Sequence, residues 1–392
     1  MSSCIRNADV EIWAGIRRGI IGSVMLVAAL AAINSQIVSA QGVTESTIII
    51  GQSGPLTGVL AASYKEGLSG AQIYFDAINK RGGINGRKIV VESLDDKQDV
   101  KLALGNAQIL IEEKRVLALF MYRTTPAIEA ALPLAEKAGV PFLFPQVGSA
   151  AAYDPNLRYS FTIRAAYQVE ARQAIEQLVR LGSTKIAVLA ADDAFGRDCM
   201  KGVELGMDSA KLKPAAIEKF DNKSADVTSA VSNFMKAKPQ AVLIIANARA
   251  AADFIKKSRA QDFNPTFITL SNTSSQGFID DLGEAGRGVG IMQVFPSPTT
   301  GSGVSIEFAK ALLDTPDIKA SYATLQGYLS ARVLVEGLRR AGKKPSRESL
   351  VRALEEVKMN FNDYRIQYGS NMHHGSNFLE LSIVGKGGKI KL

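Results

Sequence analysis

Histidine and cysteine, the residues most often used in catalytic and metal sites, are scarce in this chain. It has two histidines and two cysteines among 392 residues, and the histidines, His373 and His374, are adjacent in a glycine- and asparagine-rich stretch. We expect both to be solvent-exposed turn residues, because ligand or base roles require groups that converge from separate segments. No GxSxG, HExxH or phosphate-loop motif occurs, and no GxGxxG follows a strand. The sequence therefore predicts no enzymatic activity, no cofactor and no metal site.

Long apolar runs are also missing, except near the N-terminus. Arg17 and Arg18 precede the apolar stretch GIIGSVMLVAALAAI, and small residues follow at Val38 to Ala40. This layout predicts a secretory signal peptide over residues 1–40, and the apolar core is short for a membrane span. Cleavage would remove Cys4 and leave Cys199 without a disulfide partner. We expect a periplasmic protein that does not insert into the membrane once the signal is removed.

The formal net charge of +8 raises the question of an anionic partner. The basic residues are dispersed, however, and pairs such as Lys256 with Lys257 lie on helical patterns whose other face is apolar. No basic segment is interleaved with aromatic residues of the kind that stack on bases. The sequence favours no nucleic-acid partner.

Short apolar runs alternate with amphipathic helical patterns from Ser46 onward. The first series begins with STIIIGQSG. The second begins near Arg164, with a helix expected at Val169 to Leu181, the strand KIAVLAAD and a later helix expected at Ala250 to Ala260. Continuous apolar strands separated by helices are typical of a parallel sheet covered on both faces. Two series in a chain of this length predict an α/β fold with two doubly wound parallel-sheet lobes.

A mainly helical segment follows the second series and ends in short β-like pieces. We expect these helices to pack on the first lobe and the last strand to return to the second, so that a three-strand hinge joins the lobes. The predicted lobes are residues 44–163 with 296–374, and residues 164–295 with 375–392.

Ligands of open parallel sheets gather at the carboxyl ends of strands. In this chain the turns at those ends are rich in glycine and in polar residues. The candidate ligand-binding residues are Ser53, Tyr122, Arg123, Thr124, Thr125, Val147, Gly148 and Ser149 in the first lobe, and Phe195, Asn247, Arg249, Ser271 and Asn272 in the second.

The junction at Arg123 to Pro126 illustrates the chemistry that we expect. Thr125 is placed to cap a helix whose first residue is Pro126, and the free N–H groups of that first turn would suit a carboxylate or carbonyl. Arg123 could add a charge-assisted contact. In the alternative interpretation, Thr125 only caps its helix and Arg123 pairs with a surface acid.

In this order and spacing, the motifs GQSGPLTG, LFMYRTTPAIEAALPL, ADDAFG and HHGSNFLELSIVGKGGKI resemble the Leu/Ile/Val-binding class of periplasmic solute-binding proteins, with the type 1 periplasmic binding fold. The resemblance implies a receptor that closes two lobes over a small solute and delivers it to the permease subunits of an ABC importer in the inner membrane. It also implies that Thr125 and the Val147–Ser149 turn hold a ligand carboxylate and that Phe195 packs on the ligand.

Two departures from that family bear on the ligand. The acid that meets the ammonium of amino acid ligands would fall near Ser271 or Asn272, and neither is acidic. Arg123 adds a cation. The charges predict a carboxylate- or amide-bearing solute, such as an aromatic or short-chain acid or an amide, more than a plain amino acid.

Two other functions stay open at this level. A sensor that reports a ligand to a membrane receptor or regulator would present the same cleft. An exported hydrolase is a further alternative, and it would need a nucleophile beside a histidine at a strand end.

Overall fold

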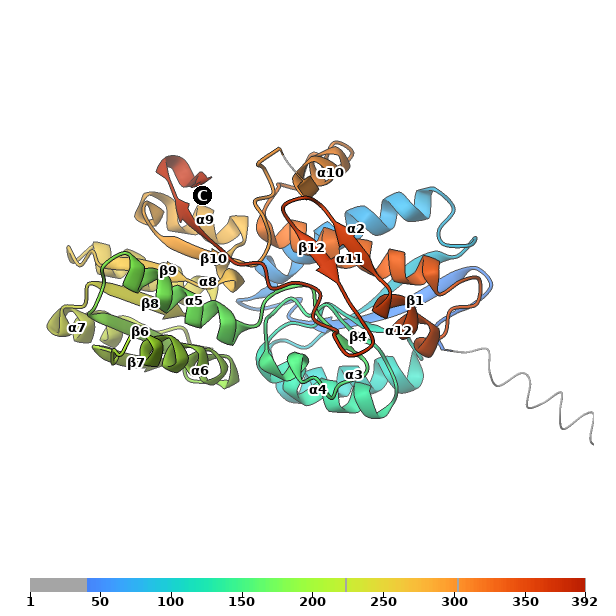
Figure 1. Cartoon of the computed structure of the whole chain (residues 1–392), viewed down its shortest axis with the longest axis horizontal. Coiled ribbons are helices and arrows are strands. Elements are labelled where there is room, and N and C mark those ends of the chain that lie inside the picture. The colour runs from blue at the N-terminus through green and yellow to red at the C-terminus, as the bar shows by residue number, and fades with distance from the viewer. Residues whose placement is uncertain (1–40, 223, 302, 392) are drawn as a thin grey trace, which may run out of the picture.

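The computed structural model describes residues 41–222, 224–301 and 303–391, and it has two α/β lobes side by side (Figure 1). The predicted signal peptide, residues 1–40, lies outside the described residues. Each lobe is built on its own sheet, and the fold class predicted from the sequence is confirmed. No helix of the described part of the chain combines the length and apolarity that a membrane crossing requires.

The first lobe contains a five-stranded parallel sheet in the order β2-β1-β3-β4-β5. Its strands are short except at β1 and β2, which pair in register along eight residues. The strands are β1 (Thr47–Gly54), β2 (Lys88–Asp95), β3 (Leu119–Phe120), β4 (Phe142–Leu143) and β5 (Ser160–Phe161). The helical segments between them are α2 (Ala61–Lys80), α3 (Val100–Gln108) with a π-helical extension (Ile109–Glu113), α4 (Thr125–Lys137) and a 3₁₀ turn (Ala150–Tyr153).

The second lobe contains a seven-stranded sheet in the order β14-β13-β10-β9-β8-β6-β7. Its strands are β6 (Ile186–Ala191), β7 (Ala216–Phe220), β8 (Ala241–Ile245), β9 (Thr266–Thr269), β10 (Gly290–Gln293), β13 (Glu380–Val384) and β14 (Ile390–Lys391). The covering helices are α5 (Tyr167–Arg180), α6 (Ala194–Ser209), α7 (Thr228–Ala237), α8 (Ala248–Arg259) and α9 (Gln276–Leu282). The sheet is not wholly parallel, since β13 runs antiparallel to β10 and to β14. The chain enters β13 on its return from the first lobe and therefore runs opposite to β10.

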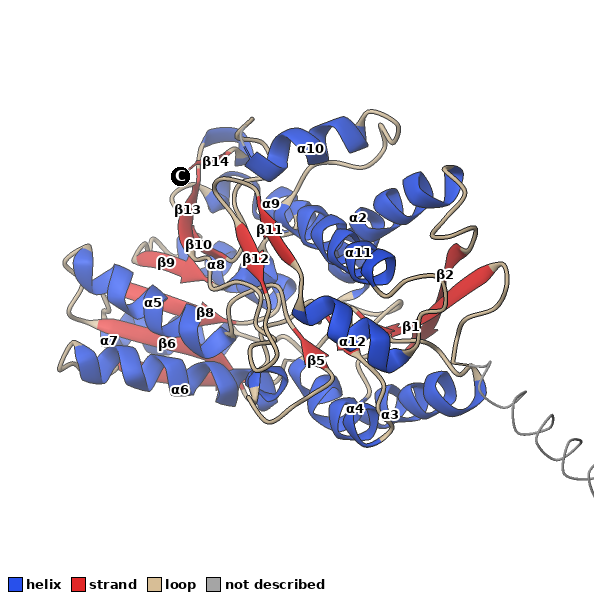
Figure 2. Ribbon diagram, turned by 45° about the vertical axis from the view of Figure 1, so that its right-hand side comes forward, coloured by secondary structure: helices blue, strands red, loops and turns tan. Residues whose placement is uncertain are grey.

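The late helices pack on the first lobe, as expected from the sequence (Figure 2). They are α10 (Gly303–Leu312), α11 (Tyr322–Arg340) and α12 (Arg347–Glu355), followed by the hairpin β11 (Lys358–Asn360) and β12 (Arg365–Gln367). Glycines allow α11 and α2 to approach closely: a Cβ at Gly70 would lie 1.8 Å from the carbonyl oxygen of Thr324, and one at Gly327 would lie 1.8 Å from that of Gly67.

The chain passes between the sheets three times, after β5, after β10 and before β13. The first and third passages are joined by backbone hydrogen bonds, from Thr162 N to the His373 oxygen (2.9 Å) and from Gly375 N to the Thr162 oxygen (2.8 Å). The lobe bounds given above stay a prediction.

The prediction of exposed histidines is wrong for His373. Its side chain is buried and stacks on Phe161, with ring centroids 3.9 Å apart, and its Nε2 atom lies 3.3 Å from Glu355 Oε1. His374 is half-buried against the ring of Tyr153. Backbone hydrogen bonds with Thr162 hold this stretch against the first lobe. A local turn pattern could not predict this packing. Burial lowers the pKa of both imidazoles.

Candidate functional site

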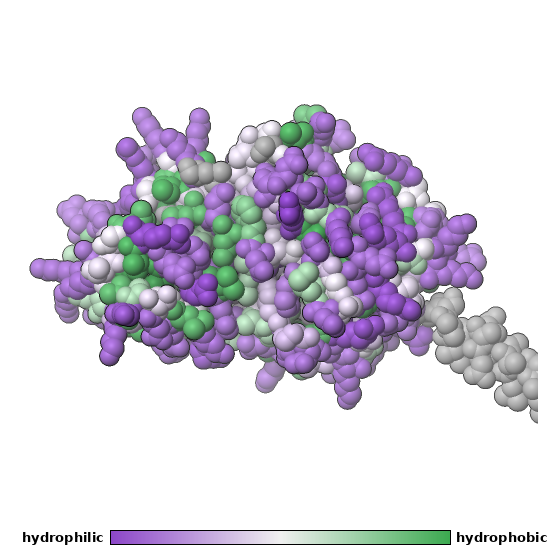
Figure 3. Space-filling view, in the orientation of Figure 1, coloured by the Kyte–Doolittle hydropathy of each residue, from purple (hydrophilic) through white to green (hydrophobic). Residues whose placement is uncertain are grey.

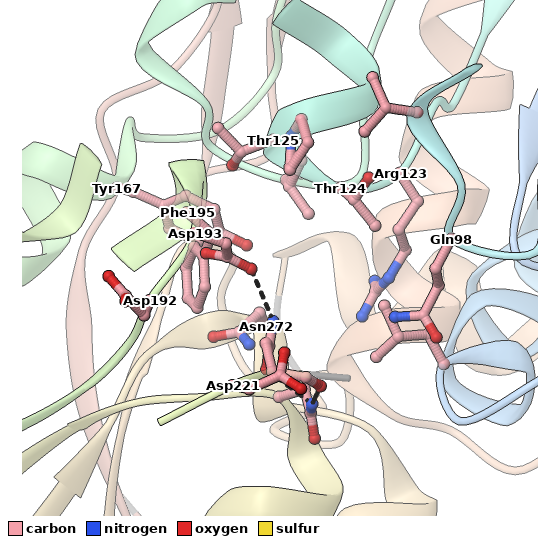
Figure 4. A pocket seen from close by; sticks show the side chains of 16 residues that line it. Gln98, Arg123, Thr124, Thr125, Tyr167, Asp192, Asp193, Phe195, Asp221 and Asn272 are labelled. Atoms are coloured by element: carbon pink, nitrogen blue, oxygen red, sulfur yellow. Dashed lines mark hydrogen bonds between the residues drawn. The ribbon is translucent and has the colours of Figure 1, made fainter. Parts of the chain in front are cut away.

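A cavity of about 320 Å³ lies between the lobes (Figure 4). Most of its residues belong to loops or helix starts that follow the carboxyl ends of parallel strands, as expected for a doubly wound sheet. The lining residues are Leu60, Gln98, Val100, Arg123, Thr124, Thr125, Pro126, Val147 and Tyr167, with Asp192, Asp193, Phe195, Asp221, Asn222, Asn247 and Asn272 from the second lobe.

The first lobe presents the start of helix α4 to the cavity. The predicted cap at Thr125 is wrong: Thr124 is the N-cap, and its hydroxyl accepts a hydrogen bond from Ala127 N at 3.4 Å. Thr124 has φ 72° and ψ 134°, a conformation rarely adopted by a β-branched residue, so the turn is strained. Thr125 is then the first helical residue, and its buried hydroxyl has no hydrogen-bond partner among the described residues.

Arg123 brings a buried positive charge to the same wall. Its side chain is only 7% exposed, and its guanidinium donates to Gln146 Oε1 (3.0 Å) and Ser63 Oγ (3.2 Å). Both acceptors are neutral, and within the described part of the chain Arg123 forms no ion pair with a carboxylate. Burial lowers the pKa of Arg123, which still leaves it a cation near neutral pH. The alternative of a surface ion pair is therefore wrong.

Aromatic and aliphatic side chains form the apolar part of the cavity. Tyr167 and Phe195 contact each other edge to face, with centroids 4.8 Å apart, and lie together on one side of the close-up in Figure 4. Leu60, Val100 and Val147 add aliphatic surface from the first lobe. This part of the cavity is suited to an apolar body of a ligand.

The second lobe adds a hydrogen-bonded polar wall. Asp193 caps helix α6 by accepting from Gly196 N at 3.0 Å, and its other oxygen accepts from Asn222 Nδ2 at 3.0 Å. Asn247 Nδ2 donates to Asn222 Oδ1 at 2.7 Å. Asp192 is exposed and lies 3.3 Å from Lys219 Nζ. Acidic and amide groups thus face the cavity opposite Arg123.

Asn272 and Ser271 have different surroundings although they are adjacent. Asn272 lines the cavity, and its amide nitrogen donates to the Ala246 oxygen at 2.8 Å. Ser271 is held outside it by a buried ion pair between Arg164 and Glu170: its hydroxyl accepts from Arg164, and its N–H donates to Glu170 Oε2 at 3.1 Å.

The structure brings together seven of the candidate residues named from the sequence. These are Arg123, Thr124, Thr125, Val147, Phe195, Asn247 and Asn272. Their roles toward a ligand stay a prediction, because position in the cavity is not a contact with a ligand.

Six candidates do not line the cavity, and the local sequence does not show why. Tyr122 points into the core against Phe142, and the hydroxyl of Ser53 accepts from Asn106 Nδ2 at 3.0 Å. Ser149 is fully buried, and a Cβ at Gly148 would point into the backbone of Ala165–Tyr167. Arg249 is exposed in a separate surface depression with Asp226 and Asp253. Ser271, as described above, is the sixth.

Several lining residues were missed by the sequence interpretation. Gln98 follows β2, and Asp221 and Asn222 follow β7, so the rule of strand carboxyl ends could have found them. Tyr167 begins α5 at the first interlobe passage, and no strand-end signal marks it.

Groups for nucleophilic or metal chemistry do not converge here. Cys199 is buried, and burial raises the pKa of its thiol, which keeps it in the unreactive form. Within the described residues no cluster of three or more histidine, cysteine or acidic side chains is arranged to hold a metal ion.

Two lobes with an interlobe cavity at the strand ends define a solute-binding protein of the two-lobed periplasmic class. Consistent with this, the model of the periplasmic binding protein family matches residues 47–387, and the chain belongs to that family. Its fold is that of the type 1 periplasmic binding proteins.

Individual relatives agree with this assignment. The Leu/Ile/Val-binding protein homolog 7 of Brucella abortus (strain 2308) is 26% identical over 358 residues, which cover 86% of this chain and 88% of the relative. A substrate-binding periplasmic protein from Ralstonia solanacearum is 30% identical, with a TM-score of 0.81 over 88% of this chain and 99% of that structure. A possible leucine/isoleucine/valine-binding protein from Rhodopirellula baltica is 22% identical, with a TM-score of 0.83 over 88% and 96% of the two chains, and it supports the fold alone.

Proposed function

We propose that this protein captures a small organic acid between its lobes and delivers it to the permease subunits of an ABC importer. The observation that carries this proposal is the charge of Arg123, which is buried at the cavity and met only by neutral side chains. A ligand carboxylate would supply the missing negative charge, and the first turn of α4 offers N–H donors beside it.

The apolar surface of the cavity supports an acid with a hydrophobic body. Phe195 and Tyr167 offer aromatic faces, and Val100 and Val147 offer aliphatic surface. Branched short-chain acids and aromatic acids have this shape and polarity. The cavity volume of about 320 Å³ is within the range of small-molecule sites.

An α-amino acid is the second candidate, and a specific observation favours it. Asp193 and Asp221 line the wall of the second lobe, so carboxylates that could face an ammonium group are present although Ser271 and Asn272 are not acidic. The name of the Brucella relative, Leu/Ile/Val-binding protein homolog 7, is consistent with this class.

Matched ligand pairs test the proposal directly. Thermal unfolding is measured with 4-methylpentanoate against leucine, and with 3-phenylpropionate against phenylalanine and 3-phenylpropanamide, because a ligand that binds the folded state raises the melting temperature by mass action. A rise with an acid but not with its amino acid or amide partner supports the proposal. A rise with leucine and none with either acid shows that the second candidate is right.

Transport and sensing are separated by a different experiment. We infer a transport role in the periplasm, with no catalysis, from membership of the family. Uptake of the identified solute into vesicles that hold the co-encoded permease, dependent on added binding protein, supports delivery. Binding without any such uptake would favour the sensor.

A further inference from the structure

We propose that Gln146 and Ser63 determine the charge specificity of the cleft, because they orient Arg123 with neutral acceptors and leave its positive charge for the solute. This inference rests on the proposed function, since it concerns the same carboxylate. Gln146 is a positioning residue in this scheme: it lies outside the cavity of about 320 Å³ and lines, with Arg123 and Ser63, a smaller adjoining pocket between the lobes.

Both acceptors are held in one orientation by further hydrogen bonds. Gln146 Nε2 donates to the Tyr64 oxygen at 3.4 Å, which turns Oε1 toward Arg123. The hydroxyl of Ser63 donates to the Leu60 oxygen at 3.1 Å, so its lone pairs face the guanidinium. Arg123 is thus fixed by groups that carry no net charge.

The packing around Gln146 is adapted to its amide. Gln146 is 2% exposed, and its amide occupies the space that a side chain at position 67 would need. A Cβ at Gly67 would lie 2.7 Å from Gln146 Nε2, closer than real Cβ contacts. The helix α2 therefore carries a glycine where the glutamine must reach Arg123.

The neighbouring carboxylates are engaged with other groups. Glu170 pairs with Arg164, and Ser271 adds to that pair. Glu66 accepts from the hydroxyl of Ser321 and, at 2.8 Å, from Gln276 N. Burial is the main cause of the lowered pKa of Arg123; Arg164 lowers it further as a like charge, whereas Tyr167 and, more weakly, Tyr64 and Glu66 act in the opposite direction.

The experiment replaces the amide by a carboxylate of nearly the same shape, Gln146→Glu, in the ligand-free protein. An unmet charge on Arg123 would form an ion pair with the new carboxylate, and the melting temperature at pH 7 should rise by roughly 3–6 °C. This gain should be lost as the pH falls from about 4 through the lowered pKa of the paired carboxylate, because protonation removes the ion pair. A lower melting temperature than that of the wild type at pH 7 would overturn the inference.

Three further variants control for side effects. Gln146→Met removes the acceptor without adding charge, and the melting temperature should fall. Gln52→Glu places a carboxylate at another buried glutamine, whose Oε1 accepts from Ser93 and lies beside no cation among the described residues, and should also destabilise. If Gln146→Glu does not fold, Ser63→Asp adds the carboxylate from the other side of Arg123, and the same sign of change is expected.

Binding provides a second measurement. An organic acid that raises the melting temperature of the wild type should bind Gln146→Glu roughly 100-fold more weakly, because the carboxylate competes for Arg123. Unchanged affinity for that acid would contradict the inference. If no acid binds the wild type, the proposed function fails, and the ligand-free comparison still decides whether the charge of Arg123 is unmet.

Discussion

Two buried arginines lie near the base of the cleft, and only Arg164 meets a carboxylate, that of Glu170. Removing one partner of such a pair leaves an unmatched buried charge, which typically costs about 3–5 kcal/mol. Arg123 exists in a comparable state in the ligand-free protein, stabilised only by neutral hydrogen bonds. At the scale of residues, Arg164 therefore has a carboxylate partner, whereas Arg123, the cation that faces the cavity, has none among the described residues.

The variant Arg123→Ala tests the binding role of this side chain. Affinity for an organic acid should fall by roughly 30-fold or more, which corresponds to about 2–5 kcal/mol for the loss of one partner of a desolvated charge pair. Titration calorimetry measures the change. Arg249→Ala is the matched control, because Arg249 is exposed outside the cavity and its loss should leave affinity unchanged. Equal affinity of Arg123→Ala and the wild type would exclude a contact with the ligand.

Asp96 predicts a pH dependence of stability at the same scale. Burial raises its pKa from 3.8 to about 6, against a hydrogen bond from Gln98 N that acts in the opposite direction. Because the folded value is the higher one, the contribution of Asp96 is fully present below 3.8 and is lost as the pH rises through about 6.

The variant Asp96→Asn, which cannot ionise, should remove this dependence. Relative to the wild type it should become more stable by about 2–3 kcal/mol between pH 4 and pH 7, since one pKa unit corresponds to about 1.4 kcal/mol. Urea unfolding at several pH values measures the difference. A difference that does not vary with pH would show that Asp96 ionises normally.

At the scale of elements, helix starts organise the cavity walls. The N-cap of helix α4 is the strained Thr124, and the N-caps of α6 and α8 are Asp193 and Asn247. Asn222 links the two caps of the second lobe, since it donates to Asp193 and accepts from Asn247. Caps that stabilise helices therefore also fix the polar groups that face the cavity.

The variant Asp193→Ala should destabilise the second lobe by about 1–2 kcal/mol, the usual cost of losing a helix cap. It should also release Asn222, which lines the cavity and donates to Asp193, so solute affinity should change as well. Chemical denaturation and calorimetry give the two quantities. Asp192→Ala is the control, because Asp192 is exposed and its side chain pairs with the exposed Lys219. Equal stability of Asp193→Ala and Asp192→Ala would contradict the role of Asp193 as a helix cap.

At the scale of the molecule, carboxylates of one lobe bind backbone N–H groups of the other. Glu66 of α2 accepts from Gln276 N, at the start of α9, at 2.8 Å. Asp198 of α6 accepts from Ala150 N at 2.9 Å. Apart from these contacts, the visible surface of both lobes is largely hydrophilic, with apolar patches on the second lobe and near the junction (Figure 3). These contacts favour the relative position of the lobes described here.

Loss of such a contact should shift the distribution of lobe positions. We expect Glu66→Ala to broaden and enlarge the radius of gyration of the ligand-free protein, because it removes the hydrogen bond that joins α2 of one lobe to the start of α9 of the other. Small-angle X-ray scattering measures the change. Asp76→Ala on the solvent face of the same helix is the control, since Asp76 accepts from Gln72 of its own helix and makes no contact with the other lobe among the described residues. Identical scattering of the two variants would show that Glu66 does not hold the lobes.

The sequence predicted most elements of this fold, because hydrophobic periodicity reports directly on local burial. The helix expected at Val169 to Leu181 is α5, and the one expected at Ala250 to Ala260 is α8, each within about two residues. The return of the last strand to the second lobe also followed from counting strands and helices. The buried state of His373 did not follow, since it depends on pairing with Thr162.

The amino-acid sequence by itself determined the two α/β series, the cleft at the strand ends and the presence of Arg123 there. Only the tertiary structure decided which polar side chains face that cleft. Local patterns show that a residue lies in a turn, whereas the direction of its side chain depends on partners distant in the chain. Ser271 is turned to Arg164, 107 residues away, and Arg123 is held by Ser63, 60 residues away. Such pairings exist only when the segments have packed, and they decide which charges remain for a ligand.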